Sequence, residues 1–174
     1  MKDVSIAIAG AGIGGLAAAL GLQRAGFRVR VYEQAPRLMQ VGAGLSLSPT
    51  AAHGLRALGL GHVLDEHAYQ PENQFIRHYS DGRLLMLGLA DAVRAHDPDA
   101  IQLDRRLRRV VRTGQPVRLE FADGSAAEAD ALVGADGQRS LVRERLFGPG
   151  APQFTGYVAW RALVPMERIG GVDL

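Results

Sequence analysis

Cysteine is absent from the 174 residues of the chain, and this absence removes several classes of chemistry. Without thiols there is no disulfide framework, no thiolate zinc site and no cysteine nucleophile. The five histidines share no spacing typical of a metal site, so we predict no bound metal. No serine lies in a G-x-S-x-G elbow, and no residue is assigned a catalytic role.

Long hydrophobic runs are also scarce. Outside the glycine-rich stretch of residues 4–22, no segment approaches 18 apolar residues free of charge. Glycines interrupt that stretch, and no cleavage site of the Ala-x-Ala type follows a clean apolar run, so it is not typical of a signal peptide. We therefore expect a cytoplasmic protein with no membrane partner.

Charge of one sign is not concentrated anywhere. The formal net charge is +2 and the arginines are scattered, which predicts no nucleic-acid partner. The densest basic run, residues 105–109 (RRLRR), contains no aromatic residue for base stacking. A solvated strand or turn is the favoured interpretation of this run, with a phosphate-binding role as the alternative.

The first thirty residues predict a strand, a helix and a second strand. Residues 4–9 (VSIAIA) form a short apolar run bounded by glycine, which is typical of a buried parallel strand. Residues 13–25 carry leucines at helical spacing, and Gly26 provides a stop signal. Residues 27–32 (FRVRVY) alternate as a strand does. The pattern indicates a βαβ unit with a right-handed crossover.

The remaining elements complete an α/β pattern. Ser48 and Pro49 predict the start of a helix, because serine caps and proline occupies the first position. Residues 75–79 and 83–87 predict a hairpin around Asp81-Gly82, followed by a short helix at 89–96. Further strands are expected at 101–103, 107–111, 117–121 and 157–164, a buried strand at 131–133, and a helix at 141–147.

A G-x-G-x-x-G motif, residues 10–15 (GAGIGG), leaves the first predicted strand and opens the first predicted helix. Gly10 permits a tight turn, Gly12 lets the backbone approach a pyrophosphate, and Gly15 lets the helix pack closely on the strand. The helix N-terminus favours phosphates. Glu33 follows the second strand, where a carboxylate accepts both ribose hydroxyls of an adenosine. The motif predicts a dinucleotide site, which alone fits FAD or NAD.

Two later segments are less specific. Residues 42–49 (GAGLSLSP) place small residues where a backbone could approach a ligand, although a plain capped helix start explains them equally well. Residues 130–140 (DALVGADGQRS) deliver Asp136 to the carboxyl end of a predicted buried strand, where open α/β sheets place ligand contacts. An Asp-Gly turn with only a structural role is the alternative.

Together these motifs identify a resemblance. The chain resembles the FAD-dependent aromatic hydroxylases, flavoprotein monooxygenases of the para-hydroxybenzoate hydroxylase type, in the branch of salicylate hydroxylase and 3-hydroxybenzoate 6-hydroxylase. It carries the family's glycine fingerprint, its loop at residues 42–50, its second fingerprint at 134–143, and a segment at 156–161 (GYVAWR) similar to the strand that opens the substrate domain.

The resemblance implies a fold and an activity. We expect an α/β protein with a Rossmann-like three-layer FAD-binding domain formed by residues 1–67 and 89–150. Residues 68–88 and 151–174 would be incomplete strands of a β-rich substrate domain, whose unpaired edges favour association into oligomers. The implied cofactor is FAD, the implied co-substrate is NAD(P)H, and the implied substrate is a small aromatic acid that is hydroxylated with O2.

The resemblance also assigns cofactor contacts. In the family the backbone at the position of Leu107 lies against the adenine, and the aspartate at the position of Asp136 belongs to a fingerprint that serves both FAD and the pyridine nucleotide. The predicted cofactor-binding residues are Gly10, Gly12, Ile13, Gly14, Gly15, Glu33, Gln34, Ala43, Gly44, Leu107 and Asp136.

Two family features have no counterpart in the chain. The third fingerprint, a Gly-Asp-Ala-x-His segment, would lie beyond Leu174, and the arginine that the family carries before the helix at Leu89 is missing. We therefore expect these 174 residues alone not to hydroxylate an aromatic acid. A non-catalytic nucleotide-binding remnant is the main alternative. An NAD-dependent dehydrogenase is disfavoured by Asp136-Gly137 and by the loop at 42–49.

Overall fold

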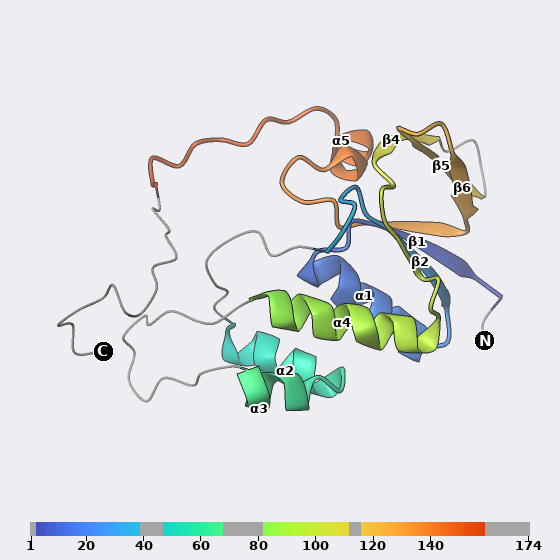
Figure 1. The fold of residues 1–174 in the computed structure, drawn as a ribbon. Coiled ribbons are helices and arrows are strands. Elements are labelled where there is room, and N and C mark those ends of the chain that lie inside the picture. The colour runs from blue at the N-terminus through green and yellow to red at the C-terminus, as the bar shows by residue number, and fades with distance from the viewer. Residues whose placement is uncertain (1–2, 39–46, 68–81, 112–115, 159–174) are drawn as a thin grey trace.

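A parallel sheet forms the centre of the molecule. The computed structural model describes residues 3–38, 47–67, 82–111 and 116–158. The sheet has the order β3-β2-β1-β7, and its strands are β1 (Ser5–Ala9), β2 (Arg28–Tyr32), β3 (Ile101–Gln102) and β7 (Ala131–Gly134). All three neighbouring pairs are parallel, so the carboxyl ends of the strands meet at one edge (Figure 1).

The predicted βαβ unit is present. Helix α1 (Ile13–Arg24) connects β1 to β2, and Gly26 follows it with a φ of +87°. Gly26 thus occupies the left-handed region that closes many helices. Strands β1 and β2 pair from Ser5 opposite Arg28 to Ala9 opposite Tyr32. Because the register is unbroken, the end of β2 arrives beside the turn that follows β1.

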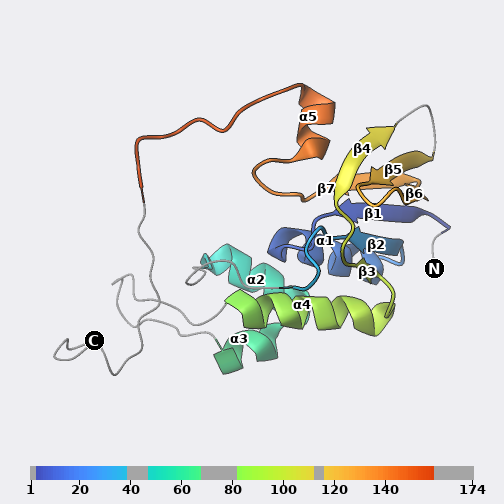
Figure 2. The same ribbon diagram turned by 45° about the horizontal axis from the view of Figure 1, so that its top comes forward.

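A second, antiparallel sheet covers one face of the parallel sheet. It contains β4 (Leu107–Val111), β5 (Val117–Phe121) and β6 (Ala126–Ala129) in that order. Along β1, Ile6 and Ile8 pack among the helices, whereas Ala7 packs against Leu119 and Phe121 of the second sheet. Both faces of β1 are therefore buried, and the predicted three-layer α/β architecture is confirmed (Figures 1 and 2).

The helical layer lies on the other face (Figure 2). It contains α1, α2 (Pro49–Ala57), α3 (Gly61–His67) and α4 (Gly82–His96). Ser48 caps α2 as predicted, its hydroxyl oxygen accepting from the Ala51 N–H at 3.2 Å. Helix α3 was not predicted. Helix α4 packs along α1 and buries Leu89, Ala90 and Val93 completely.

The predicted strand at residues 83–87 is wrong, because these residues belong to α4. Residues 83–95 (RLLMLGLADAVRA) are rich in leucine, methionine, alanine and arginine, which are strong helix formers. The helix is continuous from Gly82 to His96, and it buries Leu89, Ala90 and Val93 against α1. The other half of the predicted hairpin, residues 75–79, lies outside the described residues.

Strand β6 was missed, and β7 is less buried than predicted. Ala131 is exposed, and Leu132 and Val133 are only half-buried. Within the described residues β7 has a neighbour on one side only, β1, so it forms an edge of the sheet. The exposure follows from that position, because an edge strand has a side that nothing covers.

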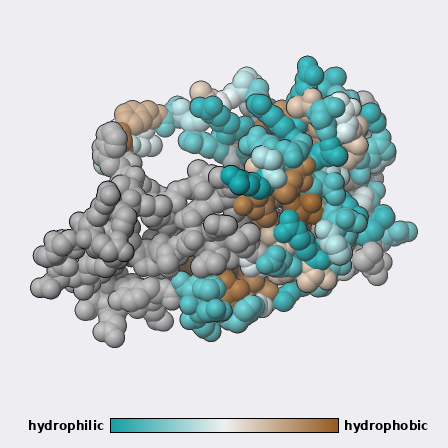
Figure 3. Space-filling view, in the orientation of Figure 1, coloured by the Kyte–Doolittle hydropathy of each residue, from teal (hydrophilic) through white to brown (hydrophobic). Residues whose placement is uncertain are grey.

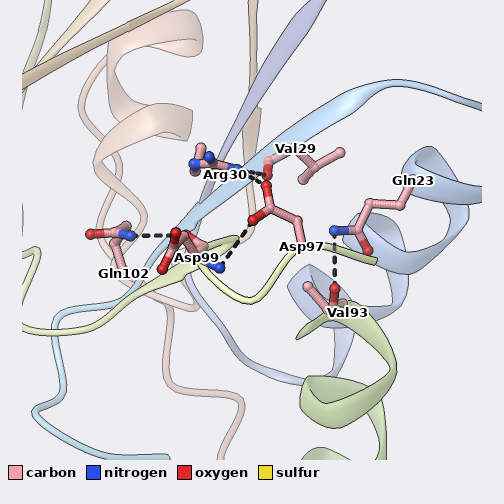
Figure 4. Close-up of polar contacts among 7 residues, drawn as sticks. All are labelled: Gln23, Val29, Arg30, Val93, Asp97, Asp99 and Gln102. Carbon is pink, nitrogen blue, oxygen red and sulfur yellow. Dashed lines mark hydrogen bonds and ion pairs between the residues drawn. The ribbon is translucent and has the colours of Figure 1, made fainter. Parts of the chain in front are cut away.

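The connection between α4 and β3 is held by polar contacts (Figure 4). The Asp97 carboxylate pairs with the Arg30 guanidinium of β2 and accepts from the Asp99 N–H at 3.0 Å. The Gln102 amide donates to the Asp99 carbonyl at 2.8 Å, and the Gln23 amide of α1 donates to the Val93 carbonyl at 3.2 Å. These contacts fix the short strand β3 next to β2.

The chain leaves the body of the molecule after α5 (Leu141–Phe147). Residues 148–158 contain no helix or strand, and hydrophobic colour is visible near the far end of this segment (Figure 3). The side chains of Phe154, Tyr157 and Val158 are exposed. Only the first two residues of the strand predicted at 157–164 are described, and they are not in a strand. Among the described helices, none combines the length and the apolar character needed to cross a membrane.

Candidate functional site

The turn after β1 is built around Gly10. Its φ is +100°, and its N–H donates to the Tyr32 carbonyl at 2.8 Å. A Cβ at Gly10 would lie 2.3 Å from the Ala135 carbonyl oxygen, so only glycine fits between the turn and the chain that follows β7. The tight turn predicted from the sequence is therefore present, and it is pressed against the second fingerprint.

The other fingerprint glycines differ from one another in what surrounds them. A Cβ on Gly15 would lie 2.0 Å from the Gly10 carbonyl oxygen, so α1 packs directly on the turn, as predicted. At Gly12 and Gly14 a Cβ would meet nothing within 4 Å. The outer side of the turn therefore offers open space next to the backbone.

Among the described residues, no side chain caps the N-terminus of α1. Gly12 is the N-cap residue and makes no side-chain cap, and the first turn contains no acidic residue. The first N–H groups of a helix have no partner within the helix and carry partial positive charge. Open space and uncapped N–H groups coincide here, which is the arrangement that a phosphate requires.

Glu33 lies at this turn. One carboxylate oxygen accepts from the Ala11 N–H at 2.7 Å, and the other accepts from the Ala35 N–H at 2.9 Å. The parallel pairing of β1 and β2 explains the position, because Glu33 directly follows Tyr32, the partner of Ala9. The neighbouring Gln34 is exposed.

Leu107 lies near Glu33 because the residues just before β4 are hydrogen-bonded to the segment that follows β2. The Arg105 N–H donates to the Glu33 carbonyl at 2.7 Å, and the Asp104 N–H donates to the Ala35 carbonyl at 3.2 Å. Leu107 then opens β4 as a half-buried residue packed against the core of the second sheet. The structure therefore brings Leu107, Glu33 and the glycine turn to one edge of the molecule.

Asp136 also lies beside the glycine turn, but its carboxylate is occupied. One oxygen accepts from the Leu141 N–H at 2.7 Å and the Val142 N–H at 3.2 Å, and the other accepts from the Ser140 hydroxyl. Ser140 in turn caps α5, accepting from the Arg143 N–H at 2.9 Å. The Asp136 side chain therefore holds the start of α5, a role that the sequence analysis did not assign.

Three further residues of the site were missed. Ala11 and Ala35 donate their N–H groups to Glu33, and the Ala135 carbonyl closes on Gly10. The only sequence signal was the small side chain at each position, which permits close backbone approach. Two predicted residues, Ala43 and Gly44, lie outside the described residues.

The ionisation of Tyr32 reflects its position between the two sheets. Its ring packs on Phe121 with the ring centres 4.8 Å apart. Burial raises the pKa of the Tyr32 hydroxyl, and the nearby Arg30 and Arg105 oppose that rise. Tyr32 is therefore a neutral packing residue whose carbonyl, rather than its hydroxyl, serves the glycine turn.

Known proteins resemble this chain, and one family profile covers the glycine turn and Glu33. A family profile described as an NAD(P)-binding Rossmann-like domain matches residues 8–43. The chain is 37% identical over 188 residues to 6-hydroxynicotinate 3-monooxygenase of Bordetella bronchiseptica, an alignment that covers 95% of this chain and 49% of that protein. It is 34% identical to 3-hydroxybenzoate 6-hydroxylase 1 of Aquipseudomonas alcaligenes, covering 94% of this chain and 48% of that protein.

A solved structure agrees with these relatives. The structure of 2,6-dihydroxypyridine-3-hydroxylase from Arthrobacter nicotinovorans matches with a TM-score of 0.70 and 29% identity, covering 85% of this chain and 40% of that one. The chain spans about half the length of the curated relatives it matches.

Proposed function

We propose that this chain, which belongs to the family of FAD-dependent aromatic hydroxylases, binds the ADP half of FAD at the glycine turn. The observation that carries the proposal is the coincidence of three features at one place. These are the open space at Gly12 and Gly14, the uncapped start of α1, and the Glu33 carboxylate.

The described residues fit the cofactor. The pyrophosphate would lie over Gly12 and Gly14, where an added Cβ would meet no other described part of the chain within 4 Å, and the N–H groups of α1 would bind it. Glu33 would accept the ribose hydroxyls with lone pairs that its bonds to Ala11 and Ala35 leave free, since a carboxylate has about four acceptor sites. Gln34 and the backbone at Leu107 would flank the adenosine.

The activity that we propose for the whole protein is the hydroxylation of a small aromatic acid with NAD(P)H and O2. When bound, FAD supplies the redox chemistry of such a reaction, and the protein supplies binding, orientation and exclusion of water. The chain's own contribution is to hold the ADP half rigidly. The names of the relatives, which act on hydroxynicotinate and hydroxybenzoate, support an aromatic acid as the substrate class.

A binding experiment tests the proposal. The purified chain is titrated calorimetrically with ADP, FAD and NAD⁺, and its absorption spectrum is recorded after incubation with FAD and desalting. We expect ADP and FAD to bind and the flavin bands to stay with the protein. Retention of NAD⁺ without FAD would instead favour the dehydrogenase alternative.

A matched pair of glycine variants makes the test specific. Gly12→Val fills the space proposed for the pyrophosphate and should abolish binding of ADP and FAD. Gly54→Val in α2 is the control, because a Cβ there also meets nothing within 4 Å and Gly54 lies on a different helix. Normal binding by Gly12→Val would show that the turn has only a structural role.

A further inference from the structure

A cavity of about 500 Å³ lies between β4 and α5. Its charged lining residues are Arg108 and Arg109 from β4 and Glu144 and Arg145 from α5, and Leu141 and Pro149 contribute to the wall. None of the residues around the glycine turn lines it. The volume is in the range of sites that hold small molecules, which is about 300–1,000 Å³.

Two consecutive arginines of β4 line this cavity at a β-bulge. Leu107 pairs with Phe121 and Arg109 pairs with the next residue, Glu120, so Arg108 is an extra residue in β4. In a regular strand, successive side chains point to opposite faces. A bulge interrupts that alternation, and at this one Arg108 and Arg109 are both exposed and both belong to the lining of the cavity. Bulges often re-aim side chains next to binding sites.

The arginines of the cavity are not used by the fold. Within the ranges that the structure describes, Arg108, Arg109 and Arg145 have no hydrogen bond or ion pair to another side chain. By contrast, Arg105 pairs with Asp123, and Arg118 pairs with Glu128 at 3.3 Å. Glu144 is the one acidic group in the lining, so the lining keeps an excess of positive charge.

We propose that this cavity binds the phosphate group of a small molecule. The planar guanidinium group binds phosphate through two parallel N–H donors, and the lining of the cavity contains three arginines without a side-chain partner among the described residues. The cavity is larger than a bare ion, so the ligand is a phosphate monoester whose carbon portion contacts Leu141 and Pro149. This inference does not depend on the proposed FAD site.

Titration of the chain with inorganic phosphate and with glucose 6-phosphate, at low ionic strength in a zwitterionic buffer, tests the inference. We expect both to bind, and the double variant Arg109→Gln/Arg145→Gln to bind at least tenfold more weakly. A monoester that binds more tightly than inorganic phosphate identifies an organic ligand. Equal affinities identify free phosphate as the ligand of the same site.

Three controls distinguish this site from others. Arg106→Gln removes one charge from an exposed position that does not line the cavity, and it should change the affinity less than twofold. Gly12→Val fills the glycine turn, so phosphate that this variant still binds is bound outside that turn. Arg145→Lys keeps the charge without the fork of donors and should lie between wild type and Arg145→Gln. Absence of binding, or an equal loss in Arg106→Gln, would overturn the inference, and circular dichroism checks that each variant is folded.

Discussion

Helices α1 and α5 follow the neighbouring strands β1 and β7 at the carboxyl edge of the parallel sheet. Their first turns differ. Within the part of the chain that the structure describes, the start of α1 has no side-chain cap and a Cβ at Gly12 or Gly14 would meet nothing within 4 Å. The start of α5 is capped by Ser140 and bound by the Asp136 carboxylate. A helix start that follows a parallel strand is therefore without a side-chain cap in one case and bound by an internal carboxylate in the other.

Replacing Gly15 should have the largest effect on this comparison. Gly15→Val places a Cβ 2.0 Å from the Gly10 carbonyl oxygen, so α1 must move away from the turn. We expect the free energy of unfolding to fall by about 3 kcal/mol, the upper range for overpacking, measured by urea denaturation.

Gly14→Ala is the matched control for Gly15→Val. A Cβ at Gly14 meets nothing within 4 Å, and alanine is favoured over glycine inside a helix by about 0.5–1 kcal/mol. Stability should therefore rise slightly in the absence of ligand. Equal stability of the two variants would mean that α1 does not rest on the turn.

Removing the Glu33 carboxylate tests the open helix start directly. Glu33→Ala should weaken ADP binding by about 1.5–3 kcal/mol, the scale for losing a charged hydrogen-bond partner. Calorimetric titration measures the change, and Glu128→Ala, on β6, should leave the affinity unchanged. Unchanged affinity in Glu33→Ala would remove Glu33 from the site.

Removing the Asp136 carboxylate tests the filled helix start. Asp136→Ala leaves the Leu141 and Val142 N–H groups without an acceptor, and we expect a loss of about 1–2 kcal/mol of stability. Ser140→Ala should cost about 1 kcal/mol. Because the Ser140 hydroxyl donates to Asp136, the double variant should lose less than the sum of the two. An additive result would contradict a shared cap.

We expect the smallest effect on stability from Asp130, whose carboxylate lies where β1 and β7 begin, at the edge of the parallel sheet opposite to the glycine turn. Asp130 accepts from the Ser5 N–H at 2.7 Å and from its hydroxyl at 2.8 Å, and these bonds lower the pKa of the Asp130 carboxyl. The unfolded chain therefore binds a proton more readily than the folded one. The stabilisation is fully present above about pH 4 and is lost as the pH falls through the lower pKa of the folded state.

Urea midpoints measured between pH 5 and pH 3 check the role of Asp130. Asp130→Asn should show a shallower loss of stability over this interval than the wild type, because one pH-dependent contribution is gone. Ser5→Ala, which removes only the hydroxyl donor, should fall between the two. Parallel curves for wild type and Asp130→Asn would show that the Ser5 contact is without effect.

The structural features predicted best from the sequence are those that depend on residues close together along the chain. The glycine turn, the stop at Gly26 and the cap at Ser48 each follow from the conformation or hydrogen bonding of a few consecutive residues. The position of Glu33 followed as well, because a βαβ unit places the ends of its two strands together. The ligand contacts assigned to these residues remain predictions.

The features that were missed depend on contacts between distant segments. The strand at residues 83–87 was predicted from the turn signal at Asp81-Gly82, but these residues belong to a continuous helix that packs against α1. The bulge at Arg108 is a property of the register between β4 and β5, which no local pattern specifies. The capping role of Asp136 depends on how the chain returns after β7, and an Asp-Gly turn has several equally common geometries.

The two backbone bonds of Glu33 have a consequence for the entropy of ligand binding. A free glutamate side chain on a surface samples several rotamers, and fixing one on binding costs about 0.5–1.5 kcal/mol. Here Ala11 and Ala35 fix the rotamer while the protein folds, so this ordering cost falls on folding rather than on recognition. A ribose bound as proposed would meet a carboxylate that is already oriented, and the same side chain holds the glycine turn through the Ala11 N–H.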